Sequence, residues 1–118
     1  MFQISDLAKV ARELADRPTI KRLFPIDSVD VKEINPAFPN GGEVHLKPSG
    51  YGPLIVRYHP RVREIDIFTV RGKIQEAFAE RLQRAYAANF PAIGVTVVVR
   101  EDQLDHSEGL SADMIRYA

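Results

Sequence analysis

The chain has 118 residues, of which 45% are hydrophobic and 27% are charged, proportions typical of a single globular domain. Sixteen basic residues balance sixteen acidic residues, and this formal net charge of +0 argues against general polyanion binding. The absence of cysteine excludes disulfides and thiolate chemistry, and it favours a cytoplasmic location. No apolar run reaches the roughly 18 residues of a membrane span, and the N-terminus lacks a secretory pattern, so we expect no membrane association.

The N-terminal segment predicts two helices. Apolar residues recur at helical spacing over residues 7–14, and Ser5 or Asp6 can cap the helix to which they belong. Pro18 ends this helix and can occupy the first turn of a second, short helix through Leu23. We expect these helices to pack on a sheet, and the alternative is an exposed or swapped helix that binds a partner.

The segment from residue 29 to residue 70 predicts an antiparallel meander of four strands. Apolar and polar residues alternate along it, as they do in a sheet with one face on the core. The expected strands span residues 29–34, 43–47, 54–58 and 62–70, with an Asn40-Gly41-Gly42 turn between the first two. In the second strand we expect Val44 and Leu46 to face the core and His45 to face outward.

A long amphipathic helix and a strongly apolar strand follow the meander. Ile74, Phe78 and Leu82 lie on one stripe of this helix, which Pro91 ends. The run from residue 93 to residue 99 is β-branched almost throughout, which favours a strand over a helix. Its apolar residues occupy both faces, so it predicts a central strand covered on both sides. The sequence does not decide whether this strand pairs parallel or antiparallel.

These elements predict one α+β domain over residues 1–118. It comprises an N-terminal helix, an antiparallel β-meander of about four strands, a long amphipathic helix packed on the sheet, and a final apolar strand that joins the sheet. Residues 101–118 form an acidic tail, since residues 101–113 include five acids and no lysine or arginine. This tail is either a mobile, solvated terminus or a segment that folds over a basic surface of the same molecule or of a dimer.

The segment from Arg57 to Lys73 is the most distinctive charged feature, with five bases against two acids. We predict a partner-binding surface at this hairpin, formed by Arg57, Tyr58, His59, Arg61, Arg63, Arg71 and Lys73. Because the arginine fork holds carboxylates and phosphates alike, an acidic protein and a nucleic acid are both candidate partners. The third interpretation is a solvated hairpin whose arginines pair with Glu64, Asp66 and the acidic tail.

Catalytic and metal-binding patterns are weak. Asp27, Asp30 and Lys32 follow the order of acids and lysine found in metal-dependent nucleases, but the two acids are too close to lie on separate strands. The three histidines lack the spacing of metal ligands. We therefore predict no catalytic residue, metal or cofactor, and favour a non-enzymatic protein-interaction domain of the accessory, adaptor or inhibitor type. It can self-associate through an open sheet edge. Nucleic-acid binding and, less favoured, metal-dependent hydrolysis are the alternatives.

Overall fold

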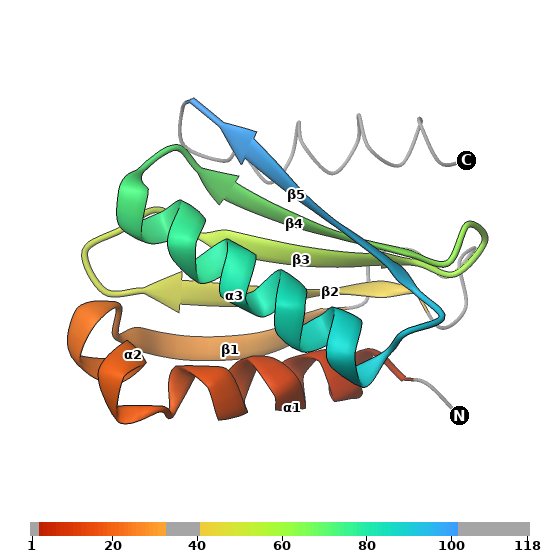
Figure 1. Cartoon of the computed structure of the whole chain (residues 1–118), viewed down its shortest axis with the longest axis horizontal. Coiled ribbons are helices and arrows are strands. Elements are labelled where there is room, and N and C mark those ends of the chain that lie inside the picture. Colours follow the sequence, from red (N-terminus) through yellow and green to blue (C-terminus); the bar gives the residue numbers. More distant parts are fainter. Residues whose placement is uncertain (1–2, 33–40, 102–118) are drawn as a thin grey trace.

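The computed structural model describes residues 3–32 and 41–101. The elements in chain order are α1 (Ile4–Ala15), α2 (Pro18–Leu23), β1 (Ile26–Lys32), β2 (Gly42–Pro48), β3 (Leu54–His59), β4 (Glu64–Val70), α3 (Lys73–Asn89) and β5 (Gly94–Arg100). The strands form one sheet in the order β1-β2-β3-β4-β5, and the helices cover one of its faces (Figure 1). This two-layer α+β architecture is the fold that the sequence predicts.

The first four strands pair antiparallel with their chain neighbours, whereas β5 pairs parallel with β4. Parallel pairing follows because α3 carries the chain back along the sheet between the end of β4 and the start of β5. The Gly94 N–H donates to the Arg63 carbonyl at 3.0 Å at one end of this pair. The Arg71 N–H donates to the Arg100 carbonyl at 2.6 Å at the other end.

The hydrophobic core lies between the helices and the inner face of the sheet. Alternation in the strands supplies its sheet side: Val44 and Leu46 are fully buried there, as predicted. Large buried side chains from the helices and the other strands complete it, namely Leu7, Leu54, Val56, Ile65, Ile67, Phe78, Leu82 and Tyr86. The Tyr86 hydroxyl donates to the Leu7 carbonyl at 2.9 Å, which joins α3 to α1 inside this apolar layer.

The start of α1 differs from the prediction. The N-cap residue is Gln3, and its backbone N–H donates to Asp6 Oδ2 at 2.9 Å. Asp6 is the third residue of the helix, and its carboxylate accepts the hydrogen bond from the N-cap backbone N–H. This contact is one of the two hydrogen bonds of a capping box. Ser5 lies within the first turn and is not the cap.

Strand boundaries also differ from the prediction in two places. The first strand begins at Ile26 rather than at residue 29, because a register shift between Ile26 and Ser28 interrupts the alternation on which the prediction rests. The fourth strand begins at Glu64 rather than at residue 62. Val62 instead belongs to the turn that joins β3 to β4.

The prediction that the last strand is central is wrong, because β5 forms an edge of the described sheet. Valines of one parity, including Val95 and Val97, pack toward the core, whereas Val98 lies on the other face and is half-buried. A strand with apolar residues on both faces can thus lie at the edge of a sheet, with a neighbouring strand along only one of its edges.

Two predicted features lie largely or wholly outside the described residues. Most of the turn expected before β2 falls within residues 33–40, and the acidic tail falls within residues 102–118 after its first member, Glu101. Of the helices in the described part, none has both the length and the apolar character needed to cross a membrane.

Candidate functional site

The seven residues predicted to bind a partner do not share one surface. Arg61 and Arg63 are exposed in the turn between β3 and β4. Arg71 and Lys73 are exposed at the opposite end of β4, where the chain enters α3. Since β4 has seven residues, each rising about 3.3 Å, the two pairs lie roughly 20 Å apart.

The other three predicted residues belong to β3. Tyr58 is partly buried against the core on the helix side of the sheet. Arg57 and His59 flank it in sequence and therefore face the opposite side, where both are buried. Their burial separates them from the exposed arginines of the turn.

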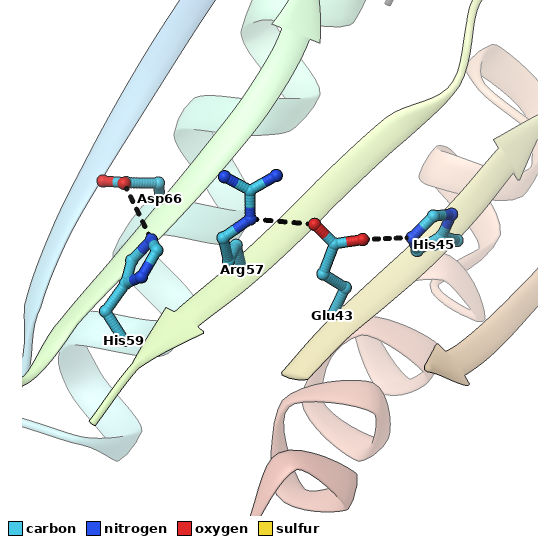
Figure 2. Close-up of polar contacts among 5 residues, drawn as sticks. All are labelled: Glu43, His45, Arg57, His59 and Asp66. Atoms are coloured by element: carbon cyan, nitrogen blue, oxygen red, sulfur yellow. Dashed lines mark hydrogen bonds and ion pairs between the residues drawn. The ribbon is translucent and has the colours of Figure 1, made fainter. Parts of the chain in front are cut away.

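Arg57 instead belongs to a line of buried polar side chains that crosses β2, β3 and β4 (Figure 2). We call Glu43, His45, Arg57, His59 and Asp66 the polar cluster. At its centre, Glu43 Oε2 accepts a hydrogen bond of 2.8 Å from Arg57 Nε. The other oxygen of this carboxylate, Oε1, lies 2.6 Å from His45 Nε2. Strand register explains the arrangement, because Glu43 lies directly opposite Arg57 on the neighbouring strand.

The second pair of the polar cluster links β3 to β4. Nε2 of His59 lies 3.5 Å from Oδ2 of Asp66, and Asp66 lies opposite Arg57 in the strand register. The Arg57 guanidinium is also 5.0 Å from the centre of the Phe68 ring, and the Arg100 guanidinium lies 5.3 Å from the same ring. Opposite charges on neighbouring strands and cation–π contacts thus compensate for the burial of charge.

The contacts of the polar cluster favour one register between β2 and β3. A one-residue slip between β2 and β3 would separate Glu43 from Arg57, leaving two buried charges without this partner. Asp27, Asp30 and Lys32 are exposed on β1, where Asp30 lies opposite His45 and Lys32 lies opposite Glu43 in the strand register. Within residues 3–32 and 41–101, no three histidine, aspartate or glutamate side chains are grouped as metal ligands would be. The described residues therefore lend no support to metal-dependent hydrolysis.

The turn between β3 and β4 is the exposed part of the predicted surface. Val62 is 50% exposed and stands between the exposed Arg61 and Arg63. Arg63 has a φ of 51°, a left-handed conformation that glycine adopts with less strain. Its carbonyl accepts the Gly94 N–H, which ties the turn to the start of β5. The Arg61–Arg63 turn thus presents an apolar side chain between two cations on a fixed backbone.

The chain matches no family model, and no curated protein or solved structure is significantly similar to it. The candidate site therefore rests on the residues of this chain alone. Sequence reasoning selected Arg57 and His59 but missed Glu43 as a site residue. The available signal was the pairing of the two central strands, which brings Glu43 opposite Arg57 once Val44 and Leu46 are set facing the core.

Proposed function

We propose that this protein is a non-enzymatic protein-interaction domain that binds an acidic partner through the Arg61–Arg63 turn. The observation that carries the proposal is the backbone of Arg63, which is left-handed at an exposed turn where glycine would be less strained. A non-glycine residue in this conformation costs on the order of 1 kcal/mol. Strained backbone of this kind concentrates at binding sites, so we infer that the Arg63 guanidinium contacts the partner.

The chemistry of the turn suits a protein surface. Arginine is enriched at the energetic centres of protein interfaces, where its planar fork can bind a carboxylate through two parallel hydrogen bonds. Val62 adds an apolar side chain, 50% exposed, between the two guanidinium groups. An acidic segment that carries one apolar residue would complement both features.

A nucleic acid is the second candidate partner. The separation of Arg61 and Arg63 from Arg71 and Lys73 by the length of β4 favours a protein, because phosphate backbones are usually followed by a continuous basic stripe. The balanced net charge points the same way. Nucleic-acid binding would appear as a retarded band whose affinity falls steeply with salt.

The test compares two charge reversals of equal size. The first is Arg61→Glu with Arg63→Glu, and the control is Arg81→Glu with Arg84→Glu on the exposed side of α3. Wild-type chain is used to capture proteins from its host, and captured proteins are then titrated against all three chains. We expect the first reversal to abolish binding of a captured acidic protein and the control to retain it. Equal binding by both variants would refute the proposal.

A further inference from the structure

The helices cover one face of the sheet, yet side chains on the opposite face are also buried (Figure 1). Strand alternation places Ile55 and Phe68, which are paired across β3 and β4, on this opposite face beside the polar cluster. Ile55 is 4% exposed and Phe68 is 3% exposed. We call the surface formed by these two residues and the polar cluster the outer face.

Contacts within the outer face do not account for this burial. Neighbouring side chains on one face of a sheet stand roughly perpendicular to it, so they cover one another's flanks and leave their tips toward solvent. The tip of Arg57 is a guanidinium group, yet its whole side chain is only 3% exposed, and that of Glu43 is 1% exposed. Another part of the chain therefore lies over the outer face.

The described elements do not supply this cover. Within residues 3–32 and 41–101, the three helices pack on the core side of the sheet, and the connections between strands lie at its ends (Figure 1). The burial is that of a single chain, so the cover belongs to residues outside the described ranges. Residues 1–2 are too few to cover seven side chains, which leaves residues 33–40 and residues 102–118.

Residues 33–40 are held at both ends. They connect β1 to β2, and Lys32 and Glu43 on either side of them are already paired. Phe68 lies two strands beyond β2, about 10 Å across the sheet. Eight residues span at most about 29 Å, so reaching Phe68 and returning would use most of their length. This segment therefore suits the outer face less well than residues 102–118.

Residues 102–118 begin at one edge of the sheet. They follow Glu101, whose Oε1 lies 3.6 Å from Nε of Arg71 at the end of β4. From β5 to β2 is three strand spacings, about 14 Å, and 17 residues cross this distance even at the helical rise of 1.5 Å per residue. The segment also carries large apolar side chains that suit Ile55 and Phe68, namely Leu104, Leu110, Met114, Ile115 and Tyr117.

We propose that residues 102–118 pack across the outer face, over β2, β3 and β4, and keep water from the polar cluster. The limits of the burial fit this width, because Asp30 on β1 and Thr96 on β5 are exposed on the same side of the sheet. Arg61 and Arg63 are exposed as well, so the cover leaves their turn open to a partner. The segment thus acts as an internal cover and not as a ligand of that turn.

A single introduced thiol reports on the outer face, because the chain contains no cysteine of its own. Ile55→Cys places the thiol under the proposed cover, and Val56→Cys places it on the core side beneath the helices. In both backgrounds, Leu110→Asp with Met114→Asp removes apolar contacts of residues 102–118. We expect labelling by a thiol-reactive dye to become about tenfold faster in the Ile55→Cys chain and to stay slow in the Val56→Cys chain.

The control adds the same charge to the same segment at polar positions. Ser107→Asp with Ser111→Asp should leave the Ile55→Cys thiol slow to react. If Leu110→Asp with Met114→Asp has no effect, or accelerates both thiols equally, the proposal is overturned.

Two further measurements separate residues 102–118 from other occupants of the outer face. Phe38→Asp, within residues 33–40, should leave the labelling rate of the Ile55→Cys chain unchanged. Dilution of that chain should also leave the rate unchanged, whereas a cover supplied by a second copy would dissociate and speed the reaction. Faster labelling on dilution, or with Phe38→Asp alone, would assign the cover elsewhere and overturn the proposal.

Discussion

Glu43 and Arg57 form an ion pair between β2 and β3, with an Nε–Oε2 distance of 2.8 Å and side chains at most 3% exposed. Removing one partner leaves the other charge buried. We expect Arg57→Met to lower the free energy of unfolding by about 3–5 kcal/mol, measured by urea denaturation.

Replacement of both charges should be tolerated far better than replacement of one. The double variant Glu43→Leu with Arg57→Met leaves neither charge stranded, so we expect it to recover most of the loss. A double variant as unstable as the worse single variant would show that the ion pair does not act as a unit.

The buried hydroxyl of Tyr86 should make the protein less stable at alkaline pH. Burial raises the pKa of the Tyr86 hydroxyl above its usual range, whereas in the unfolded chain this hydroxyl ionises near pH 10. Below pH 10 the hydroxyl keeps its proton in both the folded and the unfolded chain, so its contribution to the free energy of unfolding is fully present. Above pH 10 only the unfolded state loses the proton, so this group lowers the free energy of unfolding by up to about 1.4 kcal/mol per pH unit.

Tyr86→Phe tests this prediction by denaturation at several pH values. At neutral pH the variant should lose about 0.5–1.5 kcal/mol, because the hydrogen bond to the Leu7 carbonyl is gone. Between pH 10 and pH 11 its stability should fall less steeply than that of the wild type. Equal slopes would mean that other groups cause the alkaline loss.

The strained turn predicts opposite effects for two similar substitutions. Arg63→Gly should leave the free energy of unfolding unchanged or raise it by up to about 1 kcal/mol, measured by thermal denaturation, because glycine adopts a φ of 51° without steric strain. Arg61→Gly gains no such relief and should cost about 0.5–1 kcal/mol through the greater freedom of the unfolded chain. If both variants lose stability equally, Arg63 is not strained.

Two residues on the same predicted helical stripe should respond differently to truncation. Leu82 is fully buried, whereas Ile74 in the first turn of α3 is 40% exposed. We expect Leu82→Ala to lose about 2–5 kcal/mol and Ile74→Ala less than half as much, measured by urea denaturation. Comparable losses would place Ile74 in the core.

The spacing of apolar residues predicted the architecture, because it differs between helices, where they recur every three or four residues, and strands, where they alternate with polar residues. Phe78, Leu82 and Tyr86 recur at the spacing of a helix and are buried. Val44 and Leu46 alternate with polar residues as a half-buried strand requires. Proline and glycine then separate the elements, so the α+β class and the order of elements follow from local patterns.

Neither the polar cluster nor the edge position of β5 follows from local patterns. Alternation turns His45 and Arg57 away from the helices, and sequence reasoning equates that direction with solvent, yet both are buried. Which of these side chains meet depends on which strands are neighbours and in what register. The place of β5 likewise depends on the return path through α3, which the run of valines does not specify.

The candidate site was predictable only where exposure follows from a turn. Arg61 follows Pro60 in the predicted connection between two strands, so its exposure is expected from the sequence. Arg63 was predicted to lie within the fourth strand, whereas it belongs to the turn. The strain at Arg63 and its bond to Gly94 are not expected from the sequence, because each depends on backbone geometry set by the approach of β5.

The late position of β5 in the chain has a consequence for synthesis on the ribosome. While residues 94–100 are still inside the exit tunnel, β4 has no parallel partner, and the edge that carries Ile65 and Ile67 is open. A nascent or prematurely terminated chain that ends before Gly94 would present this apolar strand to other chains and be prone to aggregate. Completing the last strand therefore closes this side of β4 and leaves β5 at the edge of the described sheet.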